Sequence, residues 1–141
     1  YVEWVDPYIE TTRGRWFYCT PAARPFGMVA AHAFTRNKNQ GGGGYNYNFN
    51  EILGFSQINE WMVSGPNVMP VAGEVDPTQG MSGWKSEFKH GSEIIQPGYH
   101  RLFLDRYKTW VEYTATDRVT FYRLKYTSNE DAKCIRQLFD G

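Results

Sequence analysis

The feature that most restricts the fold is a series of short strand-like segments, separated by turns, in the C-terminal half of the chain. These segments are rich in β-branched and aromatic residues, and they are Tyr99–Asp105, Tyr107–Ala115, Arg118–Tyr126 and Lys133–Phe139. No stretch of about eleven residues or more keeps the 3.6-residue period of an amphipathic helix. Short strands with regular turns predict an antiparallel β-sandwich or barrel rather than a parallel sheet built from βαβ units.

The segment Tyr107–Ala115 shows which face of a strand is buried. Most of its odd positions are apolar, whereas Lys108, Glu112 and Thr114 occupy even positions. Successive side chains of a strand point to opposite faces of the sheet. The pattern therefore predicts a strand with one face in the core.

The N-terminal half is less regular. Its strand candidates are Arg15–Cys19, Phe26–Phe34 and Tyr45–Asn50, the last with aromatic residues and Asn in strict alternation. Turn signals lie at Gly41–Gly44, Gly80–Gly83 and Pro97-Gly98. No repeat or linker is visible, so the sequence predicts one all-β domain, an antiparallel β-sandwich, over residues 1–141.

Charge and composition exclude several classes of protein. The chain has 15 Lys+Arg and 15 Asp+Glu, a formal charge of zero, without the basic surface that a phosphate backbone requires, so nucleic acid is not an expected partner. No apolar run approaches the roughly 18–20 residues of a membrane span, and no signal-peptide pattern opens the chain, so neither is expected. Cys19 and Cys134 match no zinc or redox spacing; they form either a disulfide in an exported protein or two separate thiols.

Three other patterns favour structural explanations. Gly41–Gly44 lacks the Lys, Ser/Thr and helix of a phosphate-binding loop, which indicates a flexible turn or a floor beneath a ligand or second domain. Glu74 and Asp76 supply too few of the six or more oxygens that calcium takes, which favours a solvated turn. No pair of histidines has metal-ligand spacing, and surface or hydrogen-bonded positions are expected for His32, His90 and His100.

The segment Gly54–Gly65 is the most informative for function. Trp61 beside Glu60 and Asn59 is the composition of a sugar subsite, because an indole face packs on C–H groups while the acid and amide bind hydroxyls. The alternative is that Trp61 and Met62 belong to the core and Glu60 is an edge charge.

Two further segments contain groups suited to the same site. A guanidinium fork and amides bind vicinal diols well, and such groups lie in the loop of residues 15–27 and in the segment of residues 45–47. The candidate substrate-binding residues are therefore Trp16, Arg24, Tyr45, Tyr47, Gln57, Asn59, Glu60 and Trp61.

An ordered series of motifs runs through these segments. The series is Asp6-Pro7-Tyr8-Ile9, Arg24-Pro25-Phe26-Gly27-Met28-Val29, Gly44-Tyr45-Asn46-Tyr47, Gly54-Phe55-Ser56, Ser64-Gly65, Met69-Pro70 and Pro97-Gly98-Tyr99. It resembles the N-terminal domain of glycoside hydrolase family 92, whose members are calcium-dependent exo-α-mannosidases, best known from Bacteroidetes that degrade glycans. The similarity extends from Val5 to Ile135, through nearly the whole chain.

The resemblance implies a β-sandwich of the galactose-mutarotase-like, supersandwich type, packed against an (α/α)6-barrel domain that follows residue 141. In that family the acid and base carboxylates and the calcium ligands lie on the barrel, and the N-terminal domain contributes loops to the sugar subsites. No catalytic residue and no bound calcium are then expected in this chain, which alone would be inactive. A mannose-containing glycan is the expected substrate, in a periplasmic, cell-surface or secreted protein.

One departure from the family pattern concerns substrate preference. Where the family commonly has Phe-Ser-His-x-His, this chain has amides at Gln57 and Asn59, which keep hydrogen bonding but do not titrate near neutral pH. The linkage that is cleaved stays open. Two other functions also stay open: a free-standing carbohydrate-binding module and an interaction domain without a sugar role.

Overall fold

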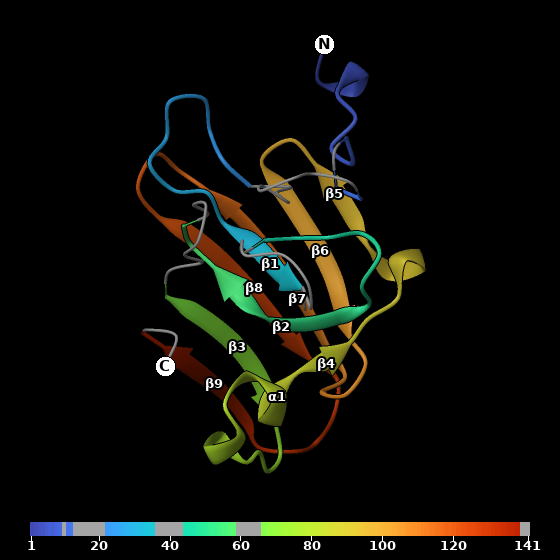
Figure 1. The fold of residues 1–141 in the computed structure, drawn as a ribbon, viewed down its shortest axis with the longest axis vertical. Coiled ribbons are helices and arrows are strands. Elements are labelled where there is room, and N and C mark those ends of the chain that lie inside the picture. Colours follow the sequence, from blue (N-terminus) through green and yellow to red (C-terminus); the bar gives the residue numbers. More distant parts are fainter. Residues whose placement is uncertain (10, 13–21, 36–43, 59–65, 139–141) are drawn as a thin grey trace.

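The computed structural model describes residues 1–9, 11–12, 22–35, 44–58 and 66–138. These residues form two antiparallel β-sheets packed as a sandwich (Figure 1). The first sheet has the strand order β1-β2-β3-β9, with β4 paired to β2, and the second has the order β5-β6-β7-β8. The all-β class and the antiparallel sandwich that the sequence predicts are confirmed.

The strands of the first sheet are β1 (His32–Thr35), β2 (Glu51–Ser56), β3 (Asn67–Ala72), β4 (Ser86–Glu87) and β9 (Ala132–Gln137). Those of the second are β5 (Ile94–Gln96), β6 (Tyr99–Leu104), β7 (Thr109–Ala115) and β8 (Thr120–Tyr126). The short helical elements are η1 (Val2–Trp4), η2 (Pro77–Gln79), α1 (Met81–Trp84) and η3 (His90–Ser92).

The second sheet follows the sequence pattern closely. β5 and β6 are joined at Pro97-Gly98, where Gln96 pairs with Tyr99 and Gly98 has a φ of 77°. Proline fixes the first central position of such a turn and glycine accepts the positive φ of the second. In β7, alternate side chains are buried from Thr109 to Ala115, so the predicted buried face is confirmed.

The core lies between the two sheets. Phe55 of β2 and Tyr113 of β7 meet across it with ring centroids 5.5 Å apart. Aliphatic side chains of both sheets surround this contact, including Met69, Leu102 and Val111, which are almost completely buried. Burying a side chain of this size stabilises the fold by about 1.5–3 kcal/mol.

The predicted strand Tyr45–Asn50 is wrong. This stretch is a loop before β2, in which the Asn46 side chain accepts a hydrogen bond of 2.9 Å from the backbone N–H of Asn48. Asparagine side chains that bond the backbone two residues ahead form turns and compete with strand pairing. Its aromatic residues therefore do not share a face: Tyr45 is buried, whereas 39% of Tyr47 is exposed.

Other boundaries also differ from the sequence prediction. Within Phe26–Phe34 only the end is extended, as β1, because residues 25 and 26 form a turn. The strands β2 and β3 lie in a region for which no strand is predicted, and the candidate strand Arg15–Cys19 lies outside the described residues. Cys134 is exposed on β9, while Cys19 is also outside the described part, so their pairing stays open.

Candidate functional site

Three segments that are distant in sequence meet at one open cleft. The cleft has a volume of about 500 Å³ and is lined by residues 5–7 and 9, residues 23–25 and residues 95–98. In Figure 1 the N-terminal segment descends beside the end of β5, which places the first and last of these segments together. Each segment contains part of the motif series found in the sequence, so folding assembles those motifs on one surface.

The Arg24 side of the cleft is shaped by a tight turn. The backbone N–H of Gly27 donates to the Arg24 carbonyl at 2.9 Å, and Phe26 has a φ of 62°. With proline at the first central position and a positive φ at the second, this is a type II turn, where glycine normally stands. A bulky residue held there is strained, and Phe26 is fully exposed. The Arg24 side chain is also exposed, with Nε 3.8 Å from Asp117 Oδ1.

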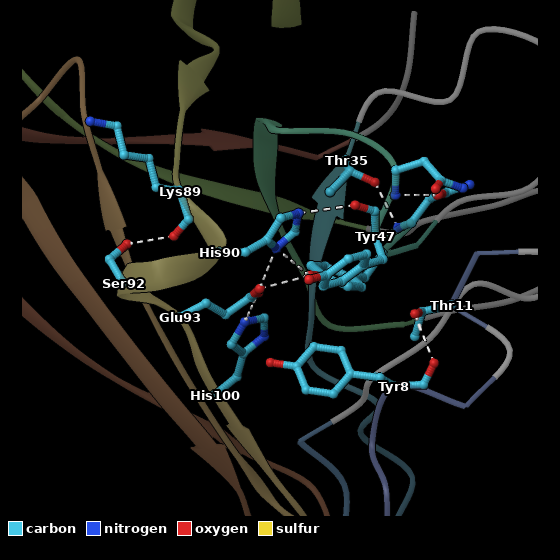
Figure 2. Close-up of polar contacts among 12 residues, drawn as sticks. Tyr8, Thr11, Thr35, Tyr47, Lys89, His90, Ser92, Glu93 and His100 are labelled. Atoms are coloured by element: carbon cyan, nitrogen blue, oxygen red, sulfur yellow. Dashed lines mark hydrogen bonds and ion pairs between the residues drawn. The ribbon is translucent and has the colours of Figure 1, made fainter.

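Behind the cleft, a buried carboxylate organises a polar cluster. The Glu93 side chain is fully buried, and three groups surround its oxygens: His90 Nδ1 at 2.8 Å and Tyr45 Oη at 2.8 Å from Oε2, and His100 Nε2 at 2.7 Å from Oε1 (Figure 2). A buried charge is costly unless hydrogen bonds satisfy it. Here each oxygen has a partner, and Tyr113 in turn contacts the other ring nitrogen of His100.

Electrostatics keep this carboxylate ionised. Burial raises the pKa of Glu93, but a hydrogen bond and a charge interaction with His100, together with hydrogen bonds from His90 and Tyr45, outweigh burial, so the pKa lies below the ordinary value. Burial and the adjacent Glu93 charge both raise the pKa of the Tyr45 hydroxyl, which stays protonated and donates. In β1, burial lowers the pKa of His32 to about 4, so this histidine is neutral at pH 7.

The cluster reaches the surface through an aromatic stack. The Tyr47 and His90 rings lie face to face, with centroids 4.0 Å apart and planes 18° apart. Tyr8 packs edge-on against Tyr47 at 5.5 Å, and His90 Nε2 lies 2.9 Å from the Tyr47 carbonyl oxygen (Figure 2). Tyr8 stands between Pro7 and Ile9 of the cleft, so the cleft and the aromatic stack share the N-terminal segment.

The candidate substrate-binding residues have different positions. Arg24 lines the cleft and Tyr47 is in the exposed stack. Tyr45 is buried with its hydroxyl bonded to Glu93, so in this structure it supports the stack from behind. Gln57 is half-buried and donates from its side-chain amide to the Tyr122 hydroxyl. Four candidates lie outside the described residues and stay predictions: Trp16, Asn59, Glu60 and Trp61.

The sequence predicts surface or hydrogen-bonded positions for the histidines, but it does not group Tyr8, His90, Glu93 and His100. The local signal for this group is His90 three positions before Glu93, ahead of the turn at Pro97-Gly98. That turn folds β6 back on β5 and brings His100 to Glu93. The contact of Tyr45 with Glu93 spans 48 positions and has no local signal.

No metal site is evident in the part of the chain that the structure describes. There, no three side chains among His, Cys, Asp and Glu gather as metal ligands. Asp76 caps η2, accepting from the backbone N–H of Thr78 at 3.0 Å, in the solvated turn that the sequence predicts before Pro77.

Among the described residues, no helix is long and apolar enough to span a membrane.

The described residues thus form an all-β sandwich with an open cleft between three of its segments. A family model, the glycosyl hydrolase family 92 N-terminal domain, matches residues 4–141. The chain belongs to this family and is its N-terminal domain. The family that the sequence motifs suggest is thus confirmed.

Solved structures share the fold. The family 92 α-mannosidase BT3965 from Bacteroides thetaiotaomicron is 23% identical with a TM-score of 0.81, over 97% of this chain and 20% of that chain. The family 92 inverting mannosidase BT2199 from Bacteroides thetaiotaomicron VPI-5482 is 22% identical with a TM-score of 0.78, over 96% of this chain and 19% of that chain. The family 92 glycosyl hydrolase ccman5 is 19% identical with a TM-score of 0.82, over 97% of this chain and 20% of that chain. A comparison with curated proteins finds no match. The chain spans about a fifth of the length of these solved structures.

Proposed function

We propose that the chain is the N-terminal sandwich of an exo-acting α-mannosidase, in which it forms one wall of the pocket that binds a mannose-containing glycan. The observation that carries the proposal is the meeting of residues 5–9, 23–25 and 95–98 at one cleft. Family membership supports the substrate class, because relatives of this fold are described as α-mannosidases and one of them as inverting.

Exposed groups at the cleft and in the adjoining aromatic stack suit a sugar. The Arg24 guanidinium offers several N–H donors in a fixed plane, which can bind two neighbouring hydroxyls at once. Tyr47 presents an aromatic ring, and such rings pack on the C–H face of a pyranose. The stack on His90 fixes the orientation of that ring. These groups would bind and orient the sugar, and neither is assigned a role in bond cleavage.

Bond cleavage is assigned to the rest of the protein. An inverting glycosidase needs one carboxylic acid to protonate the departing oxygen and one carboxylate to activate water on the opposite face of the sugar. Glu93 is buried and bonded on both oxygens, and so does not suit either role. We expect both catalytic groups on an (α/α)6-barrel domain after residue 141.

Calcium does not fit the described residues of this chain. No cluster of suitable ligands occurs in the described part, and Asp76 uses its carboxylate to cap η2. From the family pattern we propose that the calcium ligands lie on the barrel domain, and no step of the reaction is assigned here to the ion.

Apolar residues around the cleft are suited to packing against that barrel. Val5 and Ile9 line the cleft, Phe26 and Met28 follow its Arg24-Pro25 wall in sequence, and all four side chains are exposed. Exposed apolar groups gathered on one side are typical of a surface that contacts another domain.

An enzyme acting on glycans would work in the periplasm, at the cell surface or after secretion.

The test uses the parent protein with its following domain. Arg24→Ala and Tyr47→Ala should each lower kcat/KM for mannobiose by about tenfold or more, the loss expected when a charged hydrogen bond or a sugar-stacking ring is removed. Arg136 is an exposed arginine on β9 in the first sheet, and Arg136→Ala is the matched control, which should change kcat/KM less than twofold. A wild-type kcat/KM in both Arg24→Ala and Tyr47→Ala would refute the proposal that this domain forms a wall of the pocket.

A free-standing carbohydrate-binding module is the second candidate. The partly exposed stack of Tyr47 on His90 favours it, because an aromatic platform alone can bind a sugar. Calorimetric titration of the 141-residue chain with mannose oligomers separates the two functions. Binding without the following domain supports the module, and binding only in the longer protein supports the pocket wall.

A further inference from the structure

The charge on His90 follows from its neighbours. Its Nε2 lies 2.9 Å from the Tyr47 carbonyl oxygen, which only accepts hydrogen bonds, so Nε2 carries a proton. Its Nδ1 lies 2.8 Å from Glu93 Oε2.

Glu93 has no proton to give to Nδ1. Its Oε2 also accepts from the Tyr45 hydroxyl at 2.8 Å, and its Oε1 lies 2.7 Å from His100 Nε2. Hydrogen bonds from these neighbours stabilise the ionised carboxylate. Nδ1 of His90 must then donate, and both ring nitrogens are protonated.

The other titratable groups of the cluster do not change this assignment. The second nitrogen of His100 faces the Tyr113 hydroxyl, which can donate or accept, so the contacts of His100 do not fix its charge, and the protonation assigned to His90 does not depend on it. Tyr8 and Tyr45 face the cluster as neutral phenols. Lys89 precedes His90, but it is exposed, and its described contact is that of its backbone carbonyl with the Ser92 hydroxyl. His90, with 29% of its side chain exposed, is the member whose charge water can also reach.

His90 contacts Tyr47 in two ways. It donates to the Tyr47 carbonyl, and its ring stacks on the Tyr47 ring at 4.0 Å. A cation over an aromatic face is attracted by the ring quadrupole. Phe88 packs edge-on against His90 at 5.0 Å and limits its movement from the other side.

We propose that His90, held as an imidazolium by Glu93, is a positioning residue that fixes Tyr47 as a sugar-binding platform. The role of Tyr47 rests on the proposed function, whereas the charge of His90 does not. Loss of the Nδ1 proton would leave a lone pair facing the carboxylate, and the Tyr45 hydroxyl, 3.3 Å from Nδ1, could then turn to donate to it. Tyr47 would lose the cation beneath its ring.

The first experiment measures the charge directly on the 141-residue chain. Nitrogen-15 NMR of the histidine rings distinguishes an imidazolium from each neutral tautomer. At pH 7 a solvent-exposed histidine is mostly neutral, but His90 should be mostly imidazolium, while the buried His32 is neutral. A neutral His90 at pH 7 would overturn the inference. This measurement needs no variant and no sugar.

The second experiment tests positioning in the parent protein. His90→Gln keeps a donor but removes the charge and the ring, and it should raise KM for mannobiose about two- to fivefold while kcat stays within twofold. The split between KM and kcat is the readout of positioning, because a loss of folding or of a catalytic group would lower kcat. An unchanged KM in His90→Gln, or a kcat that falls as far as kcat/KM, contradicts positioning. If His90 is an imidazolium and Arg24→Ala and Tyr47→Ala are as active as wild type, the proposed pocket wall fails while the assigned charge stands.

Discussion

The Tyr45 hydroxyl lies 2.8 Å from Glu93 Oε2 and joins the loop before β2 to the residue that precedes β5. The two residues are 48 positions apart and belong to parts of the chain that pair in different sheets. Because Glu93 also contacts His90 and His100, this one bond connects the first sheet to the polar cluster of the second.

Removing the Tyr45 hydroxyl should destabilise the fold. Tyr45→Phe leaves the buried carboxylate with one donor fewer, and a hydrogen bond to a charged group contributes about 1.5–3 kcal/mol. Urea unfolding of the chain measures the loss. The matched control is Tyr99→Phe, which removes a bond of equal length, 2.8 Å, to the less buried Glu112. The control should lose less than about 1 kcal/mol, because water can replace the hydroxyl. If Tyr45→Phe and Tyr99→Phe lower the free energy of unfolding equally, burial of the carboxylate does not strengthen the bond.

Replacing Phe26 with glycine should stabilise the chain. Phe26 has a φ of 62°, where a side chain costs of order 1–2 kcal/mol and glycine does not. Glycine also loses more freedom on folding, so the expected gain is about 1 kcal/mol or less, measured by thermal unfolding. Met28→Gly is the control: Met28 is also exposed but has no positive φ, and its variant should lose about 0.5–1 kcal/mol. A loss of stability in Phe26→Gly would show that the turn is not strained.

Acid should destabilise the fold through His32. Its pKa falls from 6.5 to about 4 on folding, because the charged form is costly in the core. The unfolded chain therefore binds a proton more readily, so this stability is complete above pH 6.5 and is lost as pH falls toward 4. The expected loss is roughly 3 kcal/mol. Glu93 acts at lower pH: its lowered pKa makes its contribution disappear as pH falls below 4.5.

Urea unfolding at several pH values tests the role of His32. The dependence on pH between 6.5 and 4 should become shallower in His32→Gln, which cannot be protonated in this range. An unchanged slope would assign the acid sensitivity to other groups.

Calcium should not stabilise this chain by itself. Excess chelator should leave the Tm of the 141 residues unchanged within about 1 °C, because ligand binding raises stability only where the folded chain has a site. In the parent protein, chelator should abolish mannobiose hydrolysis. A calcium-dependent rise in the Tm of the chain would place ligands within it.

The sequence predicts the second sheet well because β6, β7 and β8 are specified locally. Their alternation and the turn at Pro97-Gly98 depend on neighbours within a few residues. The loop of residues 45–50 has the same alternation, but the Asn46 side chain bonds the backbone and forms a turn. Periodicity alone cannot distinguish these two outcomes.

The candidate site is less predictable because long-range contacts create it. Arg24 could be chosen from its chemistry, and the motif series identifies the segments that form the cleft. The burial of Tyr45 and the cluster around Glu93 depend on how two sheets pack, which no local pattern contains. Trp16, Asn59, Glu60 and Trp61 remain predictions.

The three-walled cleft also has a kinetic consequence. Its walls come from residues 5–7 and 9, 23–25 and 95–98, so it exists only after the N-terminal segment and the turn between β5 and β6, which are distant in sequence, have come together. Contacts between such distant positions form late and slowly, on the millisecond-to-second scale typical of β-sandwiches. A small molecule that binds the cleft would therefore report the completion of folding rather than collapse, and would slow unfolding of the finished sandwich.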